Sequence, residues 1–319
     1  MANDVFKSGD FSFKIDMNWA RLPEDWSFFE VVDVDIDSKD RVFVFCRGAH
    51  PVIVFDAGGN FINAWGEGLF DNPHGITIGP DDGVWCVDNT GQTVQKFTPD
   101  GRLLLTLGSR GQASGYMSGE PFNLPTKVAF DPESGAVYVA DGYNNARVHK
   151  YTADGKYLFS WGRSGPAQGE FNIVHSVCTD KKGWVYVADR ESHRIQVFDD
   201  KGHYITQWNN LHRPCGFYIT KGEPELAIIA QIPSHLELNI RAPNLGACVT
   251  IHDMEGRRLA YLGDPMSGQE KPTQFLAPHG VVMDSKGGIY VGEVSYAHYR
   301  ESSAPPPWTK PCFRKLVRI

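Results

Sequence analysis

Three histidines occupy the same position in three repeats of the chain. His74, His175 and His279 lie in the segments Asn-Pro-His-Gly, Ile-Val-His-Ser and Ala-Pro-His-Gly. Each lies ten residues before the first residue of a matching apolar stretch. The repeats that hold them are the second, fourth and sixth of six, so a closed ring of repeats would place three imidazoles around one axis. Three neutral imidazoles with an open fourth position form a catalytic zinc site. We therefore expect these histidines to bind zinc or a similar divalent transition metal.

The alternative for each histidine is turn chemistry, with the ring only capping a strand. One such histidine would fit that alternative, whereas three in strict alternation favour a metal site. The equivalent residues of the other three repeats, Val32, Thr126 and Cys215, form no second set of ligands.

Two arginines follow apolar stretches of the repeats and are expected at a shared mouth of the ring. Arg47 and Arg190 have the side chain that binds a carboxylate through two parallel hydrogen bonds. We expect both to bind substrate and to act in catalysis. The alternative is a structural ion pair with a nearby acid, which is stronger for Arg190, beside Glu191, than for Arg47. In the fifth repeat this position is assigned to Gln231.

Tyr143 lies one residue further into the same predicted mouth. Positive charge from a metal ion and an arginine favours the phenolate form of a neighbouring tyrosine, which suits it to act as a general base. The alternative is that Tyr143 only packs. His50 is a weaker candidate for contacting substrate, and His50 and His193 both suit structural or supporting roles. The acids that end the apolar stretches are expected to accept hydrogen bonds that tie strands together; they are Asp88, Asp141, Asp189 and Glu293.

The repeats that carry these residues read as antiparallel strands. Runs of about five residues rich in Val, Ile, Tyr, Phe and Trp are bounded by Gly, Asp and Pro, and a Trp-Gly or Leu-Gly exit pair recurs at intervals of 42 to 54 residues. Such periods are typical of propellers. We predict an all-β, six-bladed β-propeller that forms a single domain over residues 1–319. The N-terminal strand, residues 11–19, should complete blade six, and residues 233–246 should be an insertion in blade five.

Composition limits the classes of partner. The net charge of −7, without a basic run, argues against nucleic acid. No stretch approaches the roughly 20 apolar residues of a membrane span, and the first residues lack the pattern of a signal peptide. The six cysteines form no Cys-x-x-Cys pair. We expect a cytoplasmic protein without disulfides that neither binds membranes nor uses nucleic acid as a partner.

With these motifs together, the chain resembles a known family. Its repeats resemble NHL repeats, and its site resembles that of peptidyl-α-hydroxyglycine α-amidating lyase, from about Val31 to Glu293. The matching segments are Arg47-Gly48 with His50, Pro73-His74-Gly75, Asp141-Gly142-Tyr143-Asn144-Asn145-Ala146-Arg147, Val174-His175-Ser176, Ala188-Asp189-Arg190-Glu191, Arg194-Ile195-Gln196-Val197-Phe198 and Pro278-His279. The resemblance implies zinc held by the three histidines, two active-site arginines, an active-site tyrosine, and cleavage of a carbinolamide into an amide and glyoxylate.

The sequence departs from that family in three ways. The family's structural calcium uses an Asp directly after the third histidine, where this chain has Gly280, which argues against calcium. The family works in the secretory pathway, whereas this chain shows no signal. It often travels with a copper monooxygenase, for which this chain has no room. The expected partner is therefore a small-molecule substrate with a carboxylate, and a small hydroxylated metabolite stays open beside a peptide.

Three functions follow. The first is a zinc-dependent lyase acting on a carbinolamide or related α-hydroxy acid derivative. The second is a zinc-dependent hydrolase of an ester, lactone or amide at the same site, with metal-bound hydroxide as nucleophile. The third is a non-catalytic protein-binding propeller, which rests on the fold alone.

Overall fold

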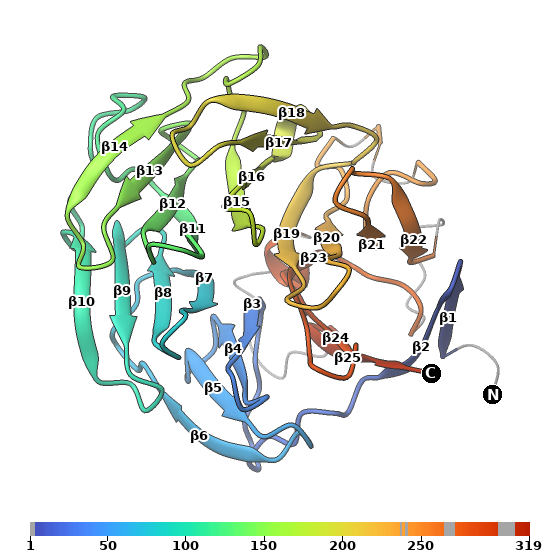
Figure 1. Cartoon of the computed structure of the whole chain (residues 1–319). Helices are drawn as coiled ribbons and strands as arrows, with labels where there is room; N and C mark the ends of the chain where they lie inside the picture. Colours follow the sequence, from blue (N-terminus) through green and yellow to red (C-terminus); the bar gives the residue numbers. More distant parts are fainter. Residues whose placement is uncertain (1–3, 237, 240–241, 265–271, 299–309) are drawn as a thin grey trace.

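Six β-sheets surround a central axis in the computed structural model of the chain, which describes residues 4–236, 238–239, 242–264, 272–298 and 310–319 (Figure 1). Within each sheet the strands are antiparallel, and neighbouring strands are mostly consecutive in the sequence. The innermost strands of successive blades contact one another all the way round the ring. The prediction of an all-β, six-bladed propeller is confirmed.

The first three blades are four-stranded, and each is numbered from the axis outward. Blade one consists of β3 (Val31–Ile36), β4 (Val42–Cys46), β5 (Val52–Phe55) and β6 (Phe61–Trp65). Blade two consists of β7 (Pro73–Ile78), β8 (Val84–Asp88), β9 (Thr93–Phe97) and β10 (Leu103–Gly108). Blade three consists of β11 (Pro125–Phe130), β12 (Val137–Asp141), β13 (Arg147–Tyr151) and β14 (Tyr157–Trp161).

The other three blades follow the same plan, with additions at the ring closure. Blade four consists of β15 (Val174–Thr179), β16 (Val185–Asp189), β17 (Arg194–Phe198) and β18 (Tyr204–Trp208). Blade five consists of β19 (Pro214–Ile219), β20 (Ala227–Gln231), β21 (Cys248–His252) and β22 (Arg258–Leu262). Blade six consists of β23 (Pro278–Met283), β24 (Ile289–Glu293), β25 (Phe313–Arg318), β2 (Phe11–Asp16) and β1 (Val5–Ser8). Two short helices are η1 (Arg190–Ser192) and α1 (Ser295–His298).

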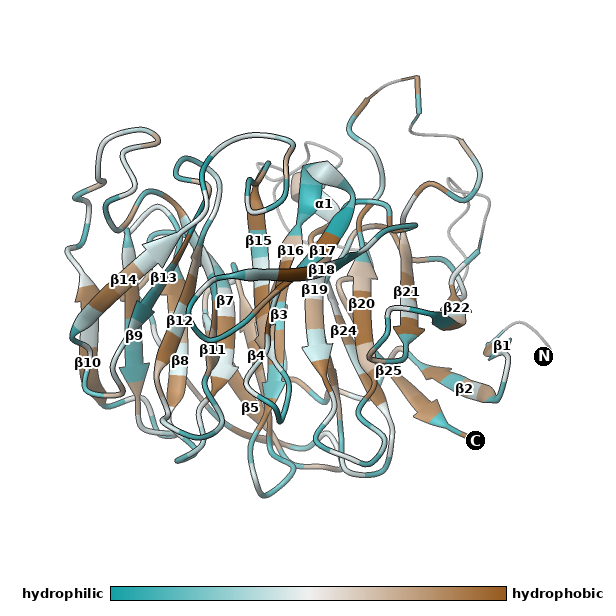
Figure 2. Ribbon diagram, turned by 45° about the horizontal axis from the view of Figure 1, so that its top comes forward, coloured by the Kyte–Doolittle hydropathy of each residue, from teal (hydrophilic) through white to brown (hydrophobic). Residues whose placement is uncertain are grey.

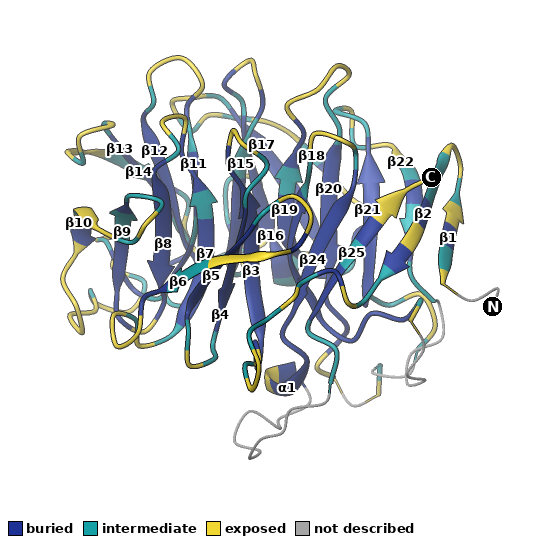
Figure 3. Cartoon of the chain, turned by 90° about the horizontal axis from the view of Figure 1, so that it is seen from below, coloured by how far each residue is buried: buried dark blue, intermediate teal, exposed yellow. Residues whose placement is uncertain are grey.

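Burial rises toward the axis. The second strand of every blade is buried at each residue, as are β5 and β17, whereas the outermost strands β6, β10, β14 and β18 alternate or lie exposed (Figure 3). The hydropathy of the strands follows this gradient, with the apolar segments on the inner strands (Figure 2). Buried strands on both faces read as continuous apolar runs, which is why "VYVAD" was visible in the sequence.

The repeated exit side chain and the repeated turn glycine meet between blades. In blade two, a Cβ on Gly101 would lie 2.7 Å from the ring of Trp65, the exit residue of blade one. Gly202 has the same relation to Trp161. Each of these glycines also has a positive φ, which glycine adopts without strain. The exit side chain of one blade therefore packs on the backbone of the next blade's turn, and this contact explains both landmarks of the repeat.

Both ends of the chain meet in blade six. The strand β2 pairs with β25 in an antiparallel register that joins Phe13 to Arg318, and β1 adds a fifth strand outside it. The strand β1 was not foreseen from the sequence. Trp19, which follows β2, packs on Gly59 of blade one as the other exit residues do on their neighbours. The N-terminal segment thus supplies an outer strand and an exit residue for blade six.

The acids at the ends of the second strands accept backbone hydrogen bonds, as predicted. Asp88 accepts from the N–H groups of Asp71 and Asn72, and Asp141 accepts from that of Asn123. In blade five, Gln231 occupies this position and accepts from the His212 N–H at 2.6 Å. The assignment of Gln231 to the mouth position of Arg47 and Arg190 was therefore wrong by one residue. Ile232 is the equivalent of the arginines, because it follows the end of its strand as they do.

The segment between β20 and β21 contains the predicted insertion, residues 233–246, of which residues 237 and 240–241 lie outside the described residues. Among the residues that the structure describes, no helix has the length and apolar character needed to cross a membrane.

Candidate functional site

The innermost strand of every blade has a register irregularity at its beginning. In β7 the pairing with β8 skips from Pro73 to Gly75, and in the other five innermost strands it skips at the equivalent place. A bulge leaves a residue unpaired and re-aims its side chain. The skipped positions include, in order around the ring, Val32, His74, Thr126, His175, Cys215 and His279. The histidines thus lie in strand bulges, whereas the sequence had placed them on loops.

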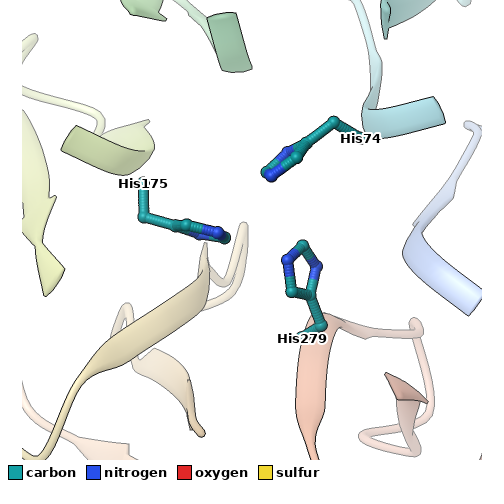
Figure 4. Close-up of side chains that lie close together, drawn as sticks. All are labelled: His74, His175 and His279. Atoms are coloured by element: carbon teal, nitrogen blue, oxygen red, sulfur yellow. The ribbon is translucent and has the colours of Figure 1, made fainter. Parts of the chain in front are cut away.

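The three histidine side chains converge on the axis (Figure 4). Their ring centroids are 4.9 Å apart for His74 and His175, 5.0 Å for His74 and His279, and 4.7 Å for His175 and His279. All three are buried, and one ligand nitrogen from each lies within 4.8 Å of the others. Ligand nitrogens around a tetrahedral zinc are roughly 3.3 Å apart, from Zn–N bonds of about 2.0–2.1 Å. Small rotations of the rings would bring this triad to that spacing, so it could hold a metal ion.

Each histidine is oriented by a carbonyl from the next blade. The Nδ1 of His74 lies 2.9 Å from the Thr126 carbonyl oxygen, that of His175 lies 3.1 Å from Cys215 O, and that of His279 lies 2.6 Å from Val32 O. A carbonyl only accepts, so Nδ1 carries the proton and Nε2 presents its lone pair. Outer hydrogen bonds of this kind orient metal-binding histidines. The odd-numbered blades therefore contribute to the site through their backbone.

The electrostatics favour neutral imidazoles. Burial, with the charges of His279 and Arg47, lowers the pKa of His74 well below its ordinary value. Burial and Arg190 do the same to the pKa of His175, and burial is also the main cause that lowers the pKa of His279 to about 3. Neutral imidazole is the form that binds a metal ion, so the donor set suits zinc without prior loss of protons.

Tyr143 joins the triad to an arginine. Its hydroxyl lies 3.2 Å from His74 Nε2 and 3.1 Å from His175 Nε2, and it accepts a hydrogen bond from the Arg190 guanidinium at 3.2 Å. The preceding Gly142 allows this reach, because a Cβ there would lie 1.8 Å from the Val174 carbonyl oxygen. The Asp-Gly-Tyr sequence thus lets blade three touch blade four beside its histidine.

Arg190 and Arg47 both lie at the site, and each is paired with a glutamate. The Arg190 Nε donates to Glu191 at 2.7 Å, and the Arg47 guanidinium donates to Glu30 at 3.1 Å. Arg47 also donates to the Pro73 carbonyl at 3.3 Å, next to His74. The expectation that Arg47 is less prone than Arg190 to an acidic partner was wrong, because Glu30, just before β3, is fully buried and faces it.

His50 is not brought to the triad. Its Nδ1 lies 2.6 Å from a Glu67 carboxylate oxygen, and its ring stacks on Trp26 at a centroid distance of 3.4 Å. The other weaker candidate, His193, accepts a hydrogen bond from the Arg213 N–H at its Nδ1. These contacts fit the structural roles that the sequence allowed for both.

Below the triad the channel narrows. A small cavity of about 10 Å³ is lined by the three histidines together with Asp33 and Lys127. The Lys127 ammonium forms an ion pair with Asp33 and donates to the Ile76 carbonyl at 2.7 Å. Lys127 also lines a larger cavity of about 370 Å³ further along the channel. The ion pair therefore separates the triad from the opposite half of the channel.

The residues at this level do not fit a structural calcium ion. A Cβ on Gly280 would lie 2.4 Å from Asp33 Cα, so no side chain follows the third histidine without a shift of the backbone. Asp33 already has the Lys127 ammonium as its cation. Calcium needs six to eight oxygen ligands, which this layer of the channel does not assemble.

Cys215 was not singled out as a site residue, yet its sulfur lies 3.3 Å from Nδ1 and 3.5 Å from Nε2 of His175. Burial raises the pKa of this thiol to about 12, which keeps it protonated. Its position in the fifth repeat, equivalent to the histidines, was the signal that could have found it.

Comparisons with known proteins agree with this architecture. A family model described as NHL repeat matches residues 122–151 and 171–198. The chain is 30% identical over 301 residues to human NHL repeat-containing protein 3, covering 88% of this chain and 81% of the relative. It is 32% identical over 250 residues to peptidyl-alpha-hydroxyglycine alpha-amidating lyase 1 of Drosophila melanogaster, covering 72% of this chain but only 44% of that relative.

Among solved structures, virginiamycin B lyase from Staphylococcus aureus matches with a TM-score of 0.59 at 14% identity, covering 88% of this chain and 82% of that one. This likeness shows the shared propeller fold.

Proposed function

The chain belongs to the NHL repeat family, and on this premise we propose that it is a zinc-dependent lyase that cleaves the C–N bond of a carbinolamide, releasing an amide and glyoxylate or a related aldehyde. The observation that carries the proposal is the position of the Tyr143 hydroxyl, within 3.2 Å of two triad nitrogens and of Arg190. A relative of 32% identity is named for this activity on peptidyl-α-hydroxyglycine.

The metal ligands in this proposal are His74, His175 and His279. When bound, zinc would supply a Lewis acid for the substrate hydroxyl. The carbonyls of Thr126, Cys215 and Val32 keep the three Nε2 atoms directed at the metal.

Tyr143 is the proposed general base. It takes the proton from the substrate hydroxyl, the oxygen forms the aldehyde C=O, and the C–N bond breaks with its electron pair going to the amide nitrogen. The proton from the hydroxyl then passes to that nitrogen, so that the amide leaves neutral. Arg190 stabilises the tyrosine oxygen while it carries negative charge, since the guanidinium already donates to it.

Arg47 and Arg190 are the proposed partners of the substrate carboxylate. They lie in blades one and four, which face each other across a six-bladed ring, so a substrate at the axis has an arginine on each side. A small molecule with a carboxylate is therefore the proposed substrate class.

The test is incubation of zinc-loaded protein with N-benzoyl-α-hydroxyglycine, followed by assays for glyoxylate and benzamide. We expect both products in equal amounts, loss of activity on chelation, and recovery with zinc. Benzoate in place of benzamide would identify hydrolysis of the amide. Turnover that is unaffected by chelation would contradict a metal-dependent reaction.

A further inference from the structure

Arg190 and Arg47 differ in the charge that surrounds them. Arg47 pairs with Glu30, so its guanidinium faces one carboxylate. Arg190 pairs with Glu191, but Glu191 also pairs with a second arginine, Arg213. The Arg190 cluster, defined as Arg190, Glu191 and Arg213, therefore has two guanidinium groups for one carboxylate. One positive charge stays unbalanced at the Arg190 end of the site, and none at the Arg47 end.

Arg213 holds Glu191 more firmly than Arg190 does. Its Nε lies 3.1 and 3.0 Å from the two oxygens of Glu191, and its terminal nitrogen lies 2.8 Å from Oε1. Arg190 makes one contact with the same carboxylate, at 2.7 Å. Burial raises the pKa of Glu191, but the two arginines outweigh burial and lower the pKa to about 2. The carboxylate is thus ionised and oriented chiefly by Arg213.

The backbone around Arg213 fixes its place. Arg213 is buried at 3% exposure and directly precedes β19. Its guanidinium also donates to the Pro233 carbonyl, and its own carbonyl accepts from Ile232 N at 3.3 Å. Arg213 therefore links the first residues after β20 to the Glu191 carboxylate beside the site.

We propose that Arg213 is a positioning residue for the reaction: by holding Glu191, it leaves Arg190 with an unbalanced positive charge and makes the Arg190 end the docking point for the substrate carboxylate. This inference rests on the proposed function, and it goes beyond it by assigning the two arginines different roles. Arg190 anchors the carboxylate, and Arg47, neutralised by Glu30, contributes hydrogen bonds with little net attraction. Without Arg213, Glu191 would pair with Arg190 alone and cancel its charge.

The test measures binding of N-benzoylglycine, a carboxylate that lacks the reactive hydroxyl, and of its methyl ester, which lacks the charge. Calorimetry on the zinc-loaded full chain gives both affinities, and needs no turnover. We expect the wild type to prefer the carboxylate, and Arg213→Met to lose about tenfold in affinity for it with little change for the ester. Arg213→Lys keeps the charge and should recover most of the loss.

The second variant separates charge from architecture. Glu191→Gln removes the negative charge, so affinity for N-benzoylglycine should hold or rise, whereas a purely structural cluster would weaken in both variants. Arg257→Met is the matched control, because Arg257 pairs with Asp253 on an exposed turn. If the protein turns over N-benzoyl-α-hydroxyglycine, Arg213→Met should raise KM and leave kcat within about threefold.

The outcomes separate the two proposals. A wild-type preference for the carboxylate that falls in Arg213→Met and survives in Glu191→Gln supports the inference, even when no lyase activity is found. Equal binding of acid and ester by the wild type would overturn it, as would an equal loss in Glu191→Gln and Arg213→Met.

Discussion

The even-numbered and odd-numbered blades share one bulge at the start of the innermost strand, yet they contribute different atoms to the axis. Blades two, four and six present imidazoles from His74, His175 and His279. Blades one, three and five present backbone carbonyls, each accepting from a histidine of the preceding blade in the ring. One repeated backbone device thus supplies both the candidate ligands and the groups that orient them, and only the ligands depend on the side chain at the bulge.

The largest difference between the two sets of blades should appear in metal content. His175→Gln removes a ligand but keeps the size of the side chain, so we expect bound zinc to fall from about one per chain to near zero. Elemental analysis of protein purified without an affinity metal column measures this. Cys215→Ala, in the next blade, is the control: it should keep its zinc because the carbonyl at this position belongs to the backbone.

Tyr143 sharpens the comparison, since it comes from an odd-numbered blade and acts through its side chain. Tyr143→Phe should lower kcat by about 10²–10⁴-fold, the usual contribution of a positioned acid or base. Zinc content should stay at the wild-type level. Steady-state kinetics with N-benzoyl-α-hydroxyglycine measures the loss; a variant with unchanged kcat would remove Tyr143 from the mechanism.

The metal-free protein should reveal the even blades through pH. The pKa of each triad histidine is lowered in the folded state, that of His279 to about 3, from an ordinary value near 6.5. The unfolded chain therefore binds more protons below pH 6.5, and the free energy of unfolding should fall as pH falls from 6.5 toward 3. Each histidine adds a slope of up to about 1.4 kcal/mol per pH unit.

Urea unfolding at pH 7 and pH 5 measures this slope. A variant with all three histidines replaced by Gln should be nearly flat over the same interval, because the odd-blade bulges carry no group that titrates there. An equal slope in both proteins would place the effect elsewhere in the chain.

The smallest effect is expected at the odd-blade side chains. Thr126→Val removes a hydroxyl that lies 3.2 Å from Ala140 O and 3.1 Å from Val174 O, and keeps the carbonyl that faces His74. Stability should drop by about 1 kcal/mol, the value of a hydrogen bond, which thermal unfolding can measure. Zinc content and kcat should be unchanged; a loss of zinc would show that the side chain matters at this position.

Sequence alone predicted the fold and the convergence of the triad for a physical reason. Repeats of similar length with the same landmarks must pack alike, so equal positions such as His74 and His175 fall at equal distances from the axis. Tyr143 and Arg190 followed from the same argument.

Other parts of the site were beyond this argument. The carbonyl acceptors are backbone atoms, which no residue type marks. Glu30 and Arg213 act through contacts between segments that do not share a repeat position with their partners. Gln231 was misplaced because an amide stands where the other blades end in an acid, and His50 was overrated because its partner, Glu67, lies on a separate loop.

The most direct measurement is zinc K-edge X-ray absorption on the metal-loaded protein. The account predicts a first shell with three imidazole nitrogens at about 2.0–2.1 Å and no sulfur, in the wild type and in Cys215→Ala alike. A sulfur scatterer near 2.3 Å that vanishes in Cys215→Ala would contradict the division between even and odd blades, and so would a shell without imidazole.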